Sequence, residues 1–557
     1  MEIIYNFQKA PRMKKTTFFF LLPVVFIVFS VSIGAFFLNA PLNDDWAYAS
    51  AVLHFTKDGK MILCDWASAT QIIHIIWGSA FAKIFGFSHN ILRLSTVITA
   101  ICSIFIFQRI LARFKIPPER TLIISSIYAL NPLFLILANS FMTDITYLFW
   151  MEISILFLLK YLDSEKTSFL WWTSFFSSMA YLTRQLGILL PFATSCVLAG
   201  EIKKKPSLLA AIWLFPAASL LGYGYWFNNI HGQTWASVNY VLSSTLKHIG
   251  EPLSFARDIF TRFSGSMIES GFFLFPAFLP FIPSFRKNWI KNSACKNIAV
   301  VFFTSLIFFA AYALITGNIP YFENNIGKWG LGVLTVGQAQ YKESAFFSST
   351  YFWTAATIVG VSSSAALVPI AREFIRRTGK KGVFLATLCG AHFLMSASGA
   401  KYFDRYLLTL FPFLLVASAA SHPFLRHSLK TACTSIFLML LIVWMGMFDY
   451  FSWNKAKWDI AEKGANLLQI NKEEIINGFD YNAWLSYEKN MVYLKNLKPL
   501  KMIGEWEWQK MINYKALTSF GRRYPFKEGL VLKYATPLSP QKGKIFLLLN
   551  PENENLP

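Results

Sequence analysis

Long apolar segments recur along the whole chain, and they restrict its possible folds more than any motif does. The sequence has 557 residues, of which 55% are hydrophobic and 15% charged, and it contains 56 Phe and 18 Trp. Apolar stretches of about 20 residues match the hydrocarbon thickness of a bilayer, and a soluble core does not need so many of them. The composition therefore predicts an α-helical polytopic membrane protein.

The positive charges are distributed as in a membrane protein. The formal net charge is +22, which by itself would also fit a nucleic-acid-binding protein. The basic residues, however, lie in short clusters between apolar segments, as expected where they orient helices by the positive-inside rule. These clusters are 9–15, 109–120, 203–205, 286–296, 372–381, and Arg426 with Lys430. We therefore expect membrane lipids as partners and no nucleic acid.

Two segments decide the topology. Residues 17–38 follow basic residues, as a signal peptide would, but the apolar run is long and no small-x-small cleavage site follows, so we expect a retained anchor. Residues 69–86 are short for a span, carry His74 and Lys83, and gather their isoleucines on one helical face. If this segment crossed the membrane, the clusters 109–120 and 203–205 would fall outside. We therefore predict a juxtamembrane helix.

This topology gives about thirteen transmembrane helices, with the N-terminus cytoplasmic and the C-terminus outside. The fold class expected is a membrane domain over residues 1–450, whose first outer loop is 39–90, followed by a small extracytoplasmic α/β domain over 451–557. The predicted spans are 17–38, 91–110, 120–138, 145–161, 168–183, 186–201, 207–226, 270–284, 297–316, 349–370, 382–397, 405–420 and 431–450.

The C-terminal residues 451–557 carry mixed charges and shorter apolar runs, and they show no catalytic signature. Their aromatic residues fit ordinary packing better than contact with a sugar or with the membrane surface. These are Tyr481, Trp484, Trp506 and Trp508. The six cysteines include no C-x-x-C pair, so neither a disulfide framework nor a zinc site is indicated.

Three carboxylates are expected at the same membrane surface. Asp44 and Asp45 follow the first helix, and Asp144 lies between the predicted third and fourth helices. Carboxylates at the end of a membrane helix are costly unless they face a wet cavity. They can remove a proton from a hydroxyl, hold a sugar or bind a hard cation. The alternative for each is helix capping, since Asp favours helix N-termini.

Cations are expected on the same face. Arg184 lies at an outer turn, and Arg405 opens a predicted helix beside Tyr406. The guanidinium group suits phosphate oxygens; snorkelling to headgroups, or pairing with Asp404, is the alternative. Arg257 and Arg262 are weaker candidates, and an interfacial role is the simpler explanation for Asp65 and His74.

Three motifs together resemble one family. The motifs are Asn43-Asp44-Asp45-Trp46-Ala47-Tyr48, the segment 77–86 leading to Leu92-Arg93-Leu94-Ser95, and Met142-Thr143-Asp144. Their order over roughly residues 17–420 resembles the GT-C membrane glycosyltransferases, and within them the bacterial aminoarabinose transferases and protein O-mannosyltransferases. That family commonly has an Asp-Glu pair after its first helix, whereas this chain has Asp45 in the second place.

The resemblance implies a polyprenyl-phosphate-linked sugar donor and transfer to an acceptor hydroxyl at the outer face of a bacterial plasma membrane. Asp44 would be the general base of an inverting displacement, with Asp45 and Asp144 beside it. Arg184, Arg405 and Tyr406 would stabilise the departing lipid phosphate. Tyr48, Asp65 and His74 would be further substrate contacts. The acceptor, whether lipid, glycan or protein, is not readable from the loops.

No nucleotide-binding motif is present, which fits a lipid-linked donor. We expect no obligatory cofactor, although paired Asp residues could hold a divalent cation. A transporter or flippase of lipid-linked sugars is the alternative class, but it would concentrate ionisable groups near the midplane, where Glu152 and His392 are the main ones. A scaffold with an outer sugar-binding tail would leave the three carboxylates unexplained.

Overall fold

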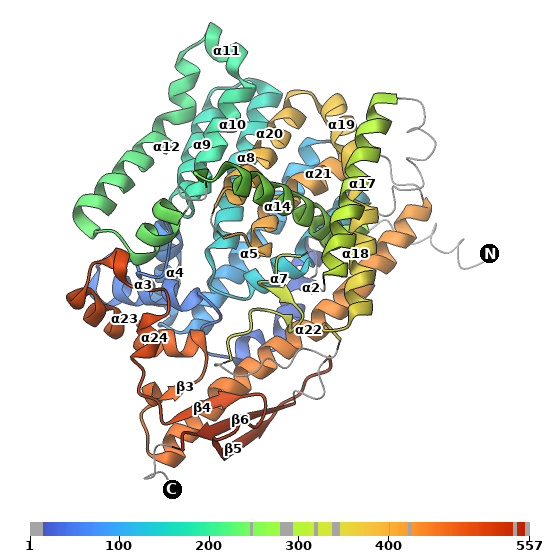
Figure 1. The fold of residues 1–557 in the computed structure, drawn as a ribbon. Coiled ribbons are helices and arrows are strands. Elements are labelled where there is room, and N and C mark those ends of the chain that lie inside the picture. Colours follow the sequence, from blue (N-terminus) through green and yellow to red (C-terminus); the bar gives the residue numbers. More distant parts are fainter. Residues whose placement is uncertain are drawn as a thin grey trace.

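A computed structural model describes most of the chain. The described residues are 15–244, 249–278, 293–316, 321–336, 346–399, 401–421, 426–538 and 543–551. The chain is mostly helical, and the helices pack side by side in one large bundle (Figure 1). A small sheet and several short helices lie at one end of this bundle, on the side of the C-terminus.

Most apolar segments form helices close to the predicted bounds, because a continuous apolar run can satisfy its backbone groups in a bilayer only as a helix. Two helices differ: α14 begins at Pro252, well before the predicted span 270–284, and α22 continues to Leu468, past the predicted end at 450. In the first half these are α2 (Lys15–Ser32), α5 (His89–Arg113), α6 (Pro118–Ala129), α7 (Pro132–Ala138), α8 (Thr143–Ser164), α9 (Ser168–Tyr181), α10 (Leu189–Val197), α11 (Ala199–Lys204) and α12 (Ser207–Trp226). In the second half they are α14 (Pro252–Phe273), α15 (Phe275–Phe278), α17 (Ser293–Ile315), α18 (Thr350–Ser364), α19 (Leu367–Thr378), α20 (Lys380–Ala397), α21 (Phe411–Ser421) and α22 (Arg426–Leu468).

The number of spans stays a prediction. Among the described residues, five helices are long and apolar enough to cross a membrane, or six if the bent pair α6 and α7 counts as one span. The two members of this pair meet at 63°, where Pro132 begins the second helix and therefore cannot continue the first. Other apolar segments form shorter helices of 10–17 residues, which are too short to count as single spans. Residues 279–284 of one predicted span lie outside the described residues.

The segment predicted to be juxtamembrane forms α4 (Ile72–Phe85), which follows α3 (Asp45–Asp58). Its 14 residues rise about 21 Å, which is less than the hydrocarbon core of about 30 Å. Gly78 allows α4 to lie against the link between α7 and α8, because a Cβ there would come within 2.4 Å of the Phe141 ring. The helix therefore packs along the end of the bundle that carries Asp44.

Arg93 fixes the chain between α2 and α3. Its side chain is buried, and Nη1 donates to the carbonyl oxygens of Ala35 and Leu38 at 2.5 and 2.8 Å. Nη2 donates to the carbonyl oxygen of Ala40 at 3.0 Å. A buried cation is stable only with such partners, so the arginine of the predicted Leu92-Arg93-Leu94-Ser95 motif holds the turn that leads into Asp44.

The C-terminal part contains a four-stranded sheet in the order β3-β4-β6-β5. Its strands are β3 (Ile475–Ile476), β4 (Ala516–Ser519), β5 (Lys527–Lys533) and β6 (Lys544–Leu549), and the helices beside them are α23 (Phe479–Leu497) and α24 (Glu507–Lys510). The β3–β4 pair is parallel, whereas β4–β6 and β5–β6 are antiparallel. The predicted domain boundary at 450/451 falls inside the 43-residue helix α22, which continues from the bundle to the sheet.

Candidate active site

Asp44 lies where α3 begins, and it is the most accessible of the three predicted carboxylates. Its side chain is 23% exposed, and its Oδ2 lies 3.3 Å from Nη1 of Arg405. Its Oδ1 accepts a hydrogen bond from the indole N–H of Trp66 at 3.0 Å. Both contacts fix the orientation of the carboxylate, while the exposed part of the side chain can still be reached by another molecule.

Asp144 lies in the first turn of α8 and pairs with Arg184, which precedes a short 3-10 turn before α10. The carboxylate is almost fully buried. Among the described residues, neither its Oδ2 nor Nε of Arg405 has a hydrogen-bond partner. Buried polar atoms without partners are rare and costly in folded proteins. The two atoms are therefore available to a molecule that binds between the ion pairs.

Tyr48 connects these two ion pairs. It lies one turn after Asp44 on α3 and is 8% exposed. Burial raises the pKa of the Tyr48 hydroxyl to about 12, while Arg184 and Arg405 oppose the rise and Asp44 and Asp144 add to it. All four charges are thus close enough to act on one hydroxyl, so the structure brings together five of the predicted site residues.

Tyr406 completes the group. The guanidinium of Arg184 lies 5.9 Å from the centre of the Tyr406 ring, and that of Arg405 lies 5.0 Å from the ring of Phe403. Aromatic faces stabilise a guanidinium without neutralising it. The rings therefore stabilise both guanidinium groups without competing for their N–H donors.

Asp45 lies beside Asp44 in sequence but points into the protein. Its Oδ1 accepts from the backbone N–H of Leu42 at 2.6 Å, and its Oδ2 accepts from that of Phe141 at 3.0 Å. Burial raises the pKa of the carboxyl to about 7, although these hydrogen bonds and Arg93 oppose the rise. Asp45 thus ties the start of α3 to the link before α8, and in doing so it joins the segments that carry Asp44 and Asp144.

His74 performs a similar task on α4. Burial lowers the pKa of its imidazole to about 4, so the ring is neutral at pH 7. Since Nε2 lies 3.1 Å from the carbonyl oxygen of Phe141, it donates there, and Nδ1 accepts from the Thr146 hydroxyl at 2.9 Å. His74 also stacks on the Phe141 ring, 4.1 Å between centroids. Its contacts are with the link and α8, next to Tyr48.

Asp65, predicted as a substrate contact, is placed apart from the two ion pairs. Its carboxylate pairs with Lys495 of α23 at 2.5 Å and accepts from the backbone N–H of Trp235 at 3.2 Å. The weaker candidates are also elsewhere: Arg262 is buried and donates to the carbonyl oxygens of Ala397 and Gly399, and Arg257 is exposed on α14.

Two residues that contribute to the site were missed from the sequence. Trp66 orients Asp44, and Asp404 holds the segment 321–336 beside Arg405 by accepting from the backbone N–H groups of Asn325 and Ile326 at 2.6 and 2.9 Å. The alternative that Arg405 pairs with Asp404 is therefore replaced by its contact with Asp44. No local pattern could reveal either role, because both depend on partners far along the chain.

The site has two carboxylates and two guanidinium groups in a largely buried setting. Within the described ranges, no group of three or more His, Cys, Asp and Glu side chains is arranged to hold a metal ion. An anion that approaches Arg184 and Arg405 would meet cations already desolvated by the protein, where charge-assisted contacts are strong. A hydroxyl that approaches Asp44 would meet a proton acceptor. The arrangement suits chemistry between a hydroxyl and a phosphate-linked group.

The apolar helices indicate an integral membrane protein, and the two ion pairs form a polar site within it. Residues 73–223, which include α4, α8 and Arg184, match the family described as dolichyl-phosphate-mannose-protein mannosyltransferase. The match confirms the resemblance to the GT-C membrane glycosyltransferases that the three motifs predicted. No curated relative matches the chain.

Solved structures of three similar proteins are distant in sequence. Protein O-mannosyltransferase Pmt1-Pmt2 from S. cerevisiae, bound to its sugar donor, is 11% identical with a TM-score of 0.34 over 43% of this chain, which spans only 37% of that protein. ArnT from Cupriavidus metallidurans is 10% identical, with a TM-score of 0.44 over 94% of this chain and 97% of that one. Oligosaccharyltransferase AglB from Archaeoglobus fulgidus, in complex with an inhibitory peptide and a dolichol-phosphate, is 12% identical. Its TM-score is 0.44, over 91% of this chain and 69% of that one. Because each score lies below 0.5, we base the function on the family match and the site geometry instead.

Proposed function

We propose that this chain is a membrane glycosyltransferase that moves a sugar from a polyprenyl-phosphate donor to an acceptor hydroxyl. The observation that carries the proposal is the meeting of a partly exposed carboxylate, Asp44, with two mostly buried arginines around Tyr48. The family match over residues 73–223 supports the donor class. The site then faces the outer surface of a bacterial plasma membrane, as the charge distribution predicts.

The reaction needs one base and one anion-binding group. Asp44 removes the proton of the acceptor hydroxyl while that oxygen forms a bond to the anomeric carbon. The bond from this carbon to the phosphate oxygen breaks, and its electron pair leaves with polyprenyl phosphate. Attack opposite to the leaving group inverts the anomeric carbon. Because the leaving group is already an anion that Arg184 and Arg405 can stabilise, no separate general acid is required.

The structure separates the three carboxylates by availability, and this supports the choice of base. Asp45 already accepts two backbone hydrogen bonds, and Asp144 is buried against Arg184. Asp44 alone among them combines exposure with a fixed orientation. Asp144 therefore steadies Arg184 and binds substrate through Oδ2, while Tyr48 and Tyr406 line the place where the sugar and phosphate meet.

The test uses Asp44→Asn, which keeps the size of the side chain and removes its basicity. We expect transfer to fall by at least about a hundredfold, while binding of the polyprenyl-phosphate donor persists. The measurement is release of polyprenyl phosphate from labelled donor by purified protein, together with donor affinity. Arg257→Ala, on the exposed face of α14, is the control and should transfer normally. Near-normal transfer by Asp44→Asn would show that another group is the base.

The same assay addresses the transporter alternative. A flippase would move intact donor across a vesicle membrane and release no polyprenyl phosphate. Release that depends on Asp44 and on an added hydroxyl acceptor supports the transferase.

A further inference from the structure

A cavity that carries several charges lies at the opposite end of the helices from Asp44. Its volume is about 570 Å³, and it lies where the end of α5 meets the end of α8. Four of its lining residues are cations and one is an acid; the lining consists of Arg109, Ala112, Arg113, Lys115, Leu156, Lys160 and Asp163. Nothing in the proposed transfer reaction uses this cavity.

The depth of the cavity matches a lipid headgroup. Asp144 and Lys160 are on the same helix, about 24 Å apart along its axis at 1.5 Å per residue. Asp163, which also lines the cavity, lies about 28.5 Å from Asp144 along the same axis, close to the thickness of a hydrocarbon core of about 30 Å. Arg109 lies one turn before Arg113 on α5, so both side chains leave the same face of the helix. Phosphate groups of membrane lipids lie at the level of Lys160 and Asp163.

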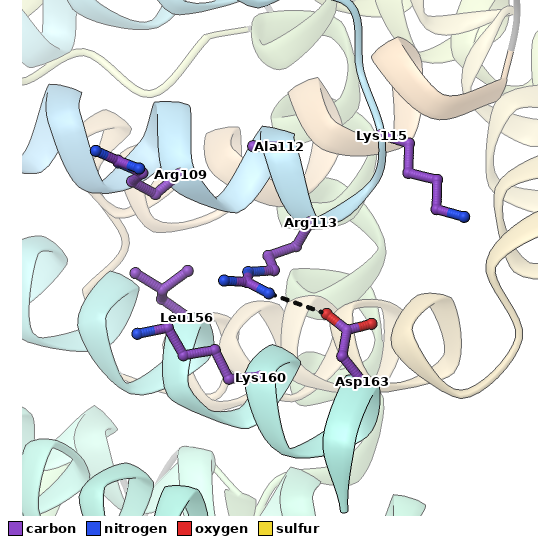
Figure 2. A pocket seen from close by; sticks show the side chains of 7 residues that line it. All are labelled: Arg109, Ala112, Arg113, Lys115, Leu156, Lys160 and Asp163. Atoms are coloured by element: carbon purple, nitrogen blue, oxygen red, sulfur yellow. Dashed lines mark ion pairs between the residues drawn. The ribbon is translucent and has the colours of Figure 1, made fainter.

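Among the residues that line the cavity, cations outnumber acids. Asp163 is already shared, since it pairs with Arg113 at 3.5 Å and with Lys381 of α20. Figure 2 shows Arg113 between the two helices, with its ion pair to Asp163, and Lys160 facing it from α8. The Lys160 ammonium group lies over the rings of Phe157 and Phe169, at 4.4 and 5.7 Å. Within the described parts of the chain it has no carboxylate partner.

We propose that this cavity binds the phosphate group of an anionic membrane lipid in the leaflet opposite to the transfer site. The fork of Arg109 matches phosphate oxygens, Lys160 supplies a second cation from the facing helix, and Leu156 offers an apolar contact to the acyl chains. General snorkelling explains basic residues at helix ends but does not require two helices to enclose a space of this size between them. The lipid would thereby join α5 to α8, the helix whose other end carries Asp144.

The test is lipid binding by the full-length purified protein, measured by native mass spectrometry with phosphatidylglycerol. Arg109→Gln with Lys160→Gln should weaken binding at least about tenfold. Lys203→Gln with Lys204→Gln is the matched control, since it removes the same charge from the exposed end of α11; it should change binding less than about twofold. Equal loss in both pairs would overturn the proposal, because it would show attraction by overall charge only.

Two further arms make the result specific. Arg109→Lys with Lys160→Arg keeps both charges, so binding should largely survive; loss of binding without loss of fold would contradict a phosphate site built on these charges. Phosphatidylcholine, which is zwitterionic, should bind no better to the wild type than to the glutamine pair. Inorganic phosphate is the last competitor: failure to displace phosphatidylglycerol supports the lipid source, whereas displacement at equal concentration would reject it in favour of a soluble anion.

Discussion

At the scale of single residues, Asp44 and Asp45 show how burial separates two identical side chains. Asp44 is partly exposed and held by side-chain donors, whereas Asp45 is buried and held by backbone donors. The sequence placed both at the site, and it could not assign their roles, because the direction of each side chain depends on how α3 packs against the link before α8. The resemblance predicted Asp44 as the base and gave no distinct role to Asp45.

The raised pKa of Asp45 gives a prediction about pH. The pKa of this carboxyl is about 7 in the folded protein, against an ordinary value of 3.8 for aspartate. Its contribution to stability is therefore fully present below about pH 4 and is lost as pH rises through 7. Asp45→Asn cannot ionise, so the difference in melting temperature between wild type and variant should fall as pH rises from about 4 to 8. Thermal unfolding of both proteins in detergent measures this difference. A difference that stays constant with pH would contradict it.

Arg405 gives a second prediction at this scale. Its Nε is buried with no hydrogen-bond partner in the part of the chain that the structure describes, and its Nη1 lies at the long distance of 3.3 Å from Asp44, so its hydrogen-bonding capacity is not exhausted. Arg405→Ala should weaken donor binding at least about tenfold, because a charge-assisted phosphate contact in a dry site is lost. Isothermal titration with the lipid donor is the measurement, and Arg257→Ala is again the control. Unchanged donor affinity would place the phosphate elsewhere.

At the scale of elements, the helices were predictable and their contacts were not. Composition alone located α5 and α8 to within a few residues, because the bilayer thickness is reflected in the length of an apolar run. The pattern of apolar residues did not predict the bend between α6 and α7, which is caused locally by Pro132. The hydrogen bonds that Asp404 accepts from the backbone N–H groups of Asn325 and Ile326 join segments nearly 80 residues apart. A local sequence pattern cannot predict such contacts.

The position of α4 gives the prediction at this scale. If α4 lies flat on the membrane, α5 is the helix that crosses after it, and residues at its two ends face opposite compartments. In a variant without native cysteines, Lys115→Cys should resist an impermeant thiol reagent in intact cells, whereas Lys60→Cys in the first loop should react. Both positions are exposed. Equal labelling at both would mean that α4 crosses, and Asp44 and Asp144 could not then share a face.

At the scale of the whole molecule, the C-terminal part packs against the residues that form the site. Trp66, which orients Asp44, stacks on Trp235 at 5.8 Å and contacts Phe479 and Trp506. Trp508 is almost fully buried, and Trp506 is 45% exposed, so the predicted packing role fits the first residue better than the second. The sequence indicated this group of aromatic residues but did not reveal that they meet the first loop.

The buried pair Lys457 and Asp480 gives the prediction at this scale. Its atoms lie 2.5 Å apart with both side chains fully buried, and the ammonium group also contacts the Thr335 hydroxyl at 2.9 Å. Asp480→Asn leaves a buried charge uncompensated and should cost about 3–5 kcal/mol. The double variant Lys457→Met with Asp480→Asn should recover much of this loss. Chemical unfolding followed by tryptophan fluorescence compares them, and equal stability of single and double variants would argue against a coupled pair.

Because α22 is continuous, it fixes the rotation of the C-terminal part about the helix axis relative to the bundle. Each residue turns an α-helix by about 100°, so one residue inserted between Tyr450 and Lys457 would rotate everything after it by about that angle. The sheet and α23 would then face away from the first loop, and Phe479 could not reach Trp66. A chimaera that exchanges the tail of this chain for another must therefore preserve the helical phase, even though no residue of the tail need touch the sugar.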